Sequence, residues 1–137
     1  MKYISVTHDQ QLVFAEMPQP EISADECLIK VKAIGVNRAD ILQRQGKYPA
    51  PKGESDILGL EVCGDVVSCG SSVTQWFVYD KVFGLVAGGG YAEYVVIKST
   101  QLFKLPKAFD YHQGAAFAET FLTAYQSLFT LAQLEKK

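Results

Sequence analysis

Hydrophobic and polar residues alternate over much of the first hundred positions, and this period of two is typical of short strands with one buried face. The pattern is clearest in residues 26–36, where Ile29 and Val31 share one face while Lys30 and Lys32 occupy the other. Polar, proline-bearing or glycine-rich segments separate the runs. The pattern predicts strands within 2–6, 12–17, 26–36, 56–70, 80–85, 90–98 and 101–106. The glycine run 88–90 predicts a tight hairpin between the fifth and sixth of them.

Three segments change to a helical period. In residues 37–45, Ala39 and Leu42 fall on one helical face beside Ile41, and Gly46 follows as a stop signal. Asp110 and Gln113 have the spacing of a capping box, which predicts a second short helix. A third helix is predicted to run from about residue 119 to residue 137, because apolar residues recur there at helical spacing: Phe121, Leu122, Tyr125, Leu128, Phe129 and Ala132.

These elements predict a mainly β fold with a few helices, built as a partly open β-barrel with a C-terminal helix. The length of 137 residues suits a single domain. The last predicted helix has no strand after it, which is unusual for a finished domain. We therefore expect the domain to come from a longer protein.

The composition narrows the classes of partner. Charged residues make up 20% of the chain and its net charge is -2, which disfavours binding to nucleic acid or to an anionic membrane. No apolar run reaches the length of about 18 residues that spans a bilayer, and the first ten residues lack the apolar core of a signal peptide. These features predict a cytoplasmic protein. The cysteines, Cys27, Cys63 and Cys69, lack zinc-site spacing, and we interpret Cys27 and Cys63 as small buried thiols.

Candidate chemistry is concentrated between residues 37 and 48. The two histidines, His8 and His112, have no potential metal ligand at a helical or strand spacing. The glycines at 88–90 precede a strand pattern rather than a helix, so they do not form a phosphate-binding loop. Asn37 directly follows a predicted strand, and its amide can both donate and accept hydrogen bonds to a ribose hydroxyl or another amide. Tyr48 adds an aromatic ring with a polar end.

Four segments in order resemble a known family: GVNRADILQRQGKYPAP, ILGLEVCGDVVSCG, GGGYAEYVVI and LTAYQSL. They are similar to motifs of the zinc-independent quinone oxidoreductases of the medium-chain dehydrogenase/reductase superfamily, and most similar to the branch of the p53-inducible quinone oxidoreductase. The resemblance implies that residues 1–137 are the N-terminal GroES-like domain, including the start of the interdomain helix at about 119–137. In the family a Rossmann domain that binds NADPH follows, and we expect it to be absent from this chain.

The resemblance also implies the chemistry. Zinc-dependent relatives have Cys where this chain has Asn37 and His where it has Leu60, so no metal site is expected. The implied reaction is hydride transfer from NADPH to a quinone or a related conjugated carbonyl. Asn37 is expected beside the nicotinamide ribose or the substrate oxygen, Tyr48 in the substrate pocket, and Thr123 near the nicotinamide. Asp40 is expected to serve the helix terminus, and Arg38 either to pair with it or to face solvent.

Two further expectations concern partners. The full-length protein is expected to be a homodimer that acts on a small quinone. The 137-residue chain alone is expected to be inactive and to self-associate through its exposed C-terminal helix. The alternative function is a non-catalytic GroES-like binding or adaptor module, which would recognise a macromolecule and would have no use for a pocket around Asn37 and Tyr48.

Overall fold

The computed structural model describes residues 1–135 and contains two antiparallel sheets. Strands β1 (Lys2–Val6) and β2 (Leu12–Glu16) pair as a hairpin. The larger sheet has the strand order β6-β3-β4-β5-β7. Its strands are β3 (Glu26–Ile34), β4 (Glu61–Cys69), β5 (Lys81–Leu85), β6 (Tyr94–Lys98) and β7 (Leu102–Lys104). The helices are α1 (Arg38–Arg44), the 3-10 helix η1 (Ser99–Gln101), α2 (Tyr111–Ala115), α3 (Ala118–Tyr125) and the π-helix η2 (Gln126–Leu131).

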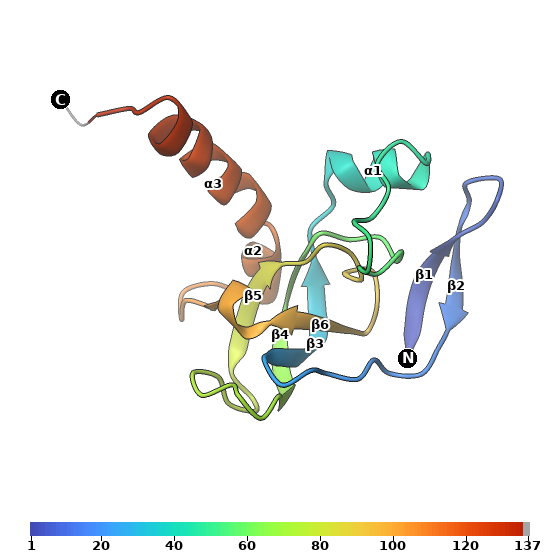
Figure 1. Cartoon of the computed structure of the whole chain (residues 1–137), viewed down its shortest axis with the longest axis horizontal. Coiled ribbons are helices and arrows are strands. Elements are labelled where there is room, and N and C mark those ends of the chain that lie inside the picture. Colours follow the sequence, from blue (N-terminus) through green and yellow to red (C-terminus); the bar gives the residue numbers. More distant parts are fainter. Residues whose placement is uncertain (136–137) are drawn as a thin grey trace.

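The two sheets do not close into a continuous barrel. A single bridge, from Tyr3 to Ala92, connects β1 with the segment before β6. Figure 1 shows the β1–β2 hairpin on one side of the larger sheet, with α3 projecting away from the sheet on the other side. The predicted mainly β fold with a partly open barrel is confirmed.

The core follows the alternation seen in the sequence. One buried cluster lies on one face of the larger sheet and is centred on Ile29, Val62, Val66 and Ile97. A second cluster packs beneath α2 and α3 and contains Cys63, Phe83, Leu105, Ala115 and Ala118. The predicted capping box of α2 is also present, since Gln113 N donates to Asp110 and Asp110 N donates to the Gln113 side chain. Helix α2 therefore begins where the sequence indicates, and it anchors the chain just before α3.

The predicted hairpin at the glycine run is wrong. Strand β5 pairs with β4 and β7, whereas β6 pairs with β3 at the opposite edge of the sheet. The glycines instead pack against residues 57–59, where Gly89 N donates to Ile57 O at 2.7 Å and Tyr91 N donates to Leu58 O at 2.8 Å. Gly89 has a φ of 95°, which favours glycine. The run is glycine-rich because two backbone segments cross closely there. A glycine run in the sequence looks the same whether it forms a tight turn or such a crossing.

The C-terminal helix is shorter than predicted. The α-helical part ends at Tyr125, the π-helix η2 continues to Leu131, and the end of the prediction at residues 136–137 lies outside the described residues. The Ser127 hydroxyl donates to Thr123 O at 2.8 Å, a contact that competes with regular helix bonds. Gln133 has a φ of 50°, a left-handed conformation that ends the helix. Helix α1, in contrast, ends at the predicted place, with Gly46 at a φ of 70°.

Cys27 and Cys63 are fully buried, as predicted, and this leads to a testable expectation. Loss of solvation raises the pKa of each thiol to about 12. A thiol whose pKa is raised in this way stays protonated at pH 8, and only the thiolate reacts with iodoacetamide. We expect mass spectrometry of the folded protein to show modification of Cys69, which is partly exposed, well before the other two. The chain in guanidinium is the control, and equal labelling of all three cysteines in the folded state would contradict the prediction.

Candidate functional site

A cavity of about 570 Å³ lies between the N-terminal part of α1 and helix α3. All three site residues indicated by the resemblance lie in its lining: Asn37 precedes α1, Tyr48 follows α1, and Thr123 belongs to α3. The complete lining is Asn37, Arg38, Ala39, Leu42, Tyr48, Glu119, Thr120, Thr123 and Ala124. Residues distant in the sequence thus converge at one site, although this convergence does not itself assign their roles.

Asn37 is held by the start of α1. It is the residue before the first helical turn, with extended backbone at φ -117° and ψ 160°. Its backbone N donates to Asp40 Oδ2 at 2.7 Å, and Asp40 N donates back to Asn37 O at 3.1 Å. The side-chain Nδ2 donates to Glu61 Oε1 at 2.9 Å. The amide therefore has a fixed donor direction, toward β4.

Asp40 is the buried residue of α1, with 2% of its surface exposed. The sequence instead predicted Ala39 and Leu42 as the apolar buried face, and these two residues line the cavity. Asp40, rather than these two residues, faces the interior. Its burial is possible because its Oδ2 accepts from the Tyr91 hydroxyl at 3.1 Å as well as from Asn37 N. Burial, together with the adjacent Asp40 carboxylate, raises the pKa of Tyr91 above its ordinary value. Asp40 thus serves the helix terminus, as expected, while Arg38 is exposed at the cavity.

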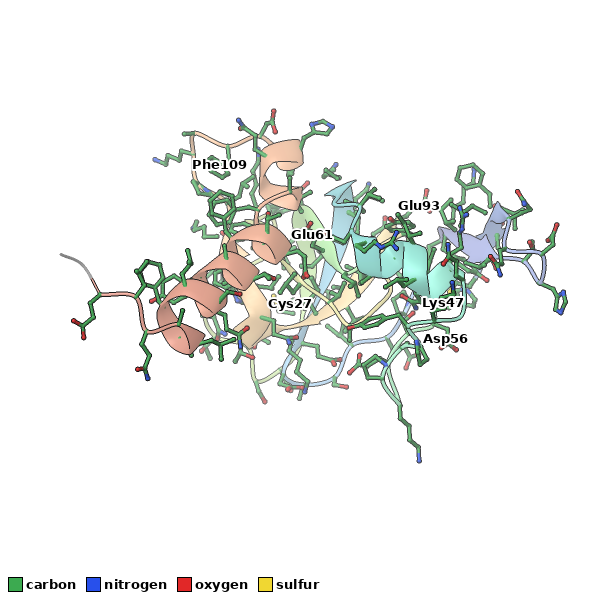
Figure 2. The ribbon with its side chains drawn as sticks, turned by 90° about the horizontal axis from the view of Figure 1, so that it is seen from above. Cys27, Lys47, Asp56, Glu61, Glu93 and Phe109 are labelled. Atoms are coloured by element: carbon green, nitrogen blue, oxygen red, sulfur yellow. The ribbon has the colours of Figure 1, made fainter. Side chains whose placement is uncertain are left out.

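Glu61 is the main residue that sequence reasoning missed. It is the first residue of β4, only 3% exposed, and its Oε2 accepts from Glu119 N at 2.9 Å while its Oε1 accepts from Asn37. Figure 2 shows Glu61 between the ribbons of α1 and α3. The signal available in the sequence was a carboxylate inside the apolar run ILGLEVCG, because a buried charged residue needs specific partners.

The lining of the cavity is mostly apolar and carries a few polar groups. Across residues 1–135, no group of three or more His, Cys, Asp or Glu side chains is placed to hold a metal ion. The cavity offers the Asn37 amide, the Thr123 hydroxyl and the Tyr48 phenol, with Tyr48 48% exposed. Such a set can bind and orient a polar, planar ligand through hydrogen bonds and stacking.

A second cavity, of about 340 Å³, lies between β1 and β3. Its lining includes the apolar side chains of Ile4, Phe14, Val31 and Ile34 and the ring of Tyr91. None of the three predicted site residues reaches it. The candidate site is therefore the cavity between α1 and α3.

Comparison with known proteins gives the family. Residues 23–107, more than half of the chain, match the alcohol dehydrogenase GroES-like domain. The chain belongs to this family. The predicted GroES-like fold is thereby confirmed, with β3 to β7 inside the matched part of the GroES-like domain.

Relatives of this GroES-like domain include oxidoreductases. A quinone oxidoreductase-like protein 2 homolog from Nematostella vectensis is 36% identical over 115 residues, which cover 83% of this chain and 32% of the relative. The crystal structure of human synaptic vesicle membrane protein VAT-1 homolog-like protein has a TM-score of 0.89 at 30% identity, covering 99% of this chain and 45% of that one. A mycobacterial protein complexed with NADPH has a TM-score of 0.86 at 31% identity, with 99% and 43% coverage.

The GroES-like domain is only a part of these proteins. The chain spans between 26% and 34% of the length of the first five curated relatives. The resemblance to quinone oxidoreductases of the medium-chain dehydrogenase/reductase superfamily is confirmed by these matches. Over residues 1–135, no helix combines the length and the apolar character that a membrane span requires.

Proposed function

We propose that this chain is the N-terminal, substrate-binding domain of a zinc-independent NADPH:quinone oxidoreductase. The observation that carries the proposal is the convergence of Asn37, Tyr48 and Thr123 on one cavity. Relatives named as quinone oxidoreductases, and a similar protein solved with NADPH, support it. The substrate is a quinone or a related conjugated carbonyl, the protein is cytoplasmic, and the full-length form is a homodimer.

The residues that line the cavity bind either the cofactor or the substrate. Asn37 and Thr123 hold the nicotinamide side of the cofactor, and the Tyr48 ring stacks on the planar substrate. NADPH, when bound, supplies the hydride. The chain contributes orientation and a partly apolar surface, formed by Ala39, Leu42 and Ala124, that limits water around the reacting groups. A quinone needs little help from an acid, since its reduction product is a stabilised phenolate.

Zinc is excluded because two of the positions that would supply its ligands carry no suitable donor atom. The two positions that supply Cys and His ligands in zinc-dependent relatives hold Asn37 and Leu60, which offer neither a thiolate nor an imidazole. The Asn37 amide is in addition already engaged by Glu61. The alternative, an adaptor module, gives no role to a cavity whose mostly apolar lining carries an amide, a hydroxyl and a phenol.

Domain exchange tests the proposal directly. Residues 1–131 would replace the equivalent segment of the quinone oxidoreductase-like relative, and the chimera would be assayed with NADPH and 1,2-naphthoquinone. We expect activity without added zinc, and we expect Tyr48→Ala to lower kcat/KM by roughly 10-fold to 100-fold through lost stacking. Tyr48→Phe keeps the ring and should retain most of the activity. Phe77→Ala, at an exposed aromatic residue outside the cavity, is the matched control.

The outcomes of this assay are distinct. A folded chimera that oxidises ethanol only when zinc is present would overturn the zinc-independent assignment. Equal losses in Tyr48→Ala and Phe77→Ala would remove the substrate-pocket role of Tyr48.

A further inference from the structure

Glu61 connects the two walls of the cavity without being part of the lining. One carboxylate oxygen accepts from the Asn37 side chain at 2.9 Å, and the other accepts from the backbone N of Glu119, in the first turn of α3, also at 2.9 Å. Asn37 and Glu119 both line the cavity, whereas Glu61 does not. Figure 2 places Glu61 between the two helices. A single buried side chain thus contacts both walls.

The local backbone leaves space for this carboxylate. Gly35 lies across from Glu61 at the end of β3, and Gly35 N donates to Glu61 O at 3.2 Å. A Cβ atom at position 35 would collide with the Glu61 carboxylate group and the carbon next to it. The absence of a side chain at position 35 therefore leaves the space that the Glu61 carboxylate occupies.

The two partners also require a carboxylate in particular. Both are N–H donors, and an ionised carboxylate accepts at both of its oxygens. Glutamine offers one acceptor and one NH2 group, so it can satisfy only one of these donors unless the Asn37 amide turns over. None of the ion pairs formed within residues 1–135 involves Glu61, and these two N–H groups provide the hydrogen bonds that its burial requires.

We propose that Glu61 is the positioning residue of the cavity, which holds the Asn37 amide with one oxygen and the first turn of α3 with the other, and so determines ligand affinity without contacting the ligand. The choice of NADPH as that ligand rests on the proposed function above. The arrangement of Asn37 and α3 does not depend on it, and the experiment separates the two.

The first measurement uses the ligand-free chain of 137 residues and the variant Glu61→Gln. In nuclear magnetic resonance spectra we expect altered side-chain NH2 signals of Asn37, faster exchange of the Glu119 amide hydrogen, or both. Glu26→Gln is the matched control, because Glu26 is also the first residue of its strand and its Oε2 accepts from a backbone N, that of Ser23, at 2.8 Å. Glu26→Gln removes the same charge at a carboxylate outside the cavity lining, and should leave both signals unchanged.

The second measurement titrates NADPH and follows the amide signals of Thr123 and Ala124. Binding to this domain alone is expected in the millimolar range. We expect Glu61→Gln to weaken it by roughly tenfold, the effect of losing about one well-placed hydrogen bond. In an Asn37→Ala background the same substitution should weaken binding by a clearly smaller factor, because only the contact of Glu61 with α3 is then left to lose. A residue that only stabilises the fold would show no such dependence on Asn37.

The outcomes separate the two proposals. Unchanged Asn37 and Glu119 signals in Glu61→Gln would overturn the positioning role, whatever NADPH does, as would equal effects of Glu61→Gln with and without Asn37. Failure of NADPH to shift any cavity signal of the unsubstituted chain would instead count against the proposed function. If Glu61→Gln does not fold, Glu61→Asp is the second variant, since it keeps the charge but is too short to reach both donors, and the same changes are expected.

Discussion

Replacement of Gly59 by alanine is expected to lower the free energy of unfolding by about 3 kcal/mol. Gly59 has a φ of 102°, which alone costs an alanine roughly 1 kcal/mol. An added Cβ would also lie 2.5 Å from the Tyr91 ring and 2.7 Å from the Tyr91 backbone N. The backbone cannot yield easily there, because Gly90 N donates to Gly59 O at 3.1 Å.

Gly53→Ala is the matched control for this prediction. Gly53 has a similar φ of 93°, yet an added Cβ would meet no atom within 4 Å. The difference between the two variants in urea unfolding therefore isolates the collision, which we expect to contribute about 2 kcal/mol. Equal losses of stability would show that residues 57–59 and the glycine run do not cross as closely as described.

The 137-residue chain is expected to self-associate through α3 and η2. Apolar side chains remain on the surface there, with Phe121 58%, Tyr125 61% and Leu131 73% exposed. Patches of this kind favour association, because burying them removes apolar area from water. Sedimentation velocity should show dimers that increase with concentration, and Tyr125→Glu should raise the dissociation constant at least roughly tenfold, since each partner would bury a charge.

Phe77→Glu provides the control for this experiment. Phe77 is 69% exposed but lies between β4 and β5, away from the C-terminal helix. The Phe77→Glu substitution should therefore leave the dissociation constant of the dimer unchanged. A strictly monomeric chain at high concentration, or equal effects of the two substitutions, would contradict the proposed surface.

The sequence predicted local structure well and long-range pairing poorly. Alternation located the strands, and Gly46 and Asp110 marked helix ends, because these signals act over a few neighbouring residues. The glycine run was misassigned, since its packing partner is the segment 57–59, far away in the chain. The length of the last helix was also overestimated, because its apolar spacing does not reveal the left-handed Gln133.

In the candidate site, too, the sequence indicated local features and missed the contacts between distant residues. The prediction that Asn37 and Tyr48 belong to a functional site rested on residue type and family resemblance, and the prediction for Thr123 rested on resemblance alone. Asp40 and Glu61 were not predicted as buried, because their burial depends on donors 51 and 58 residues away, the Tyr91 hydroxyl and the Glu119 amide. A local pattern contains no information on partners at that separation.

A side chain at position 35 would collide with the Glu61 side chain, so the residues tolerated at these two positions depend on each other. While the Glu61 side chain reaches toward Asn37 and α3, a methyl group at position 35 would displace it from these contacts. If a lineage gave up the carboxylate for a smaller residue, position 35 would be free to diversify. Among descendants of this domain, the two positions should thus change as a pair, with the loss of Glu61 preceding the loss of Gly35.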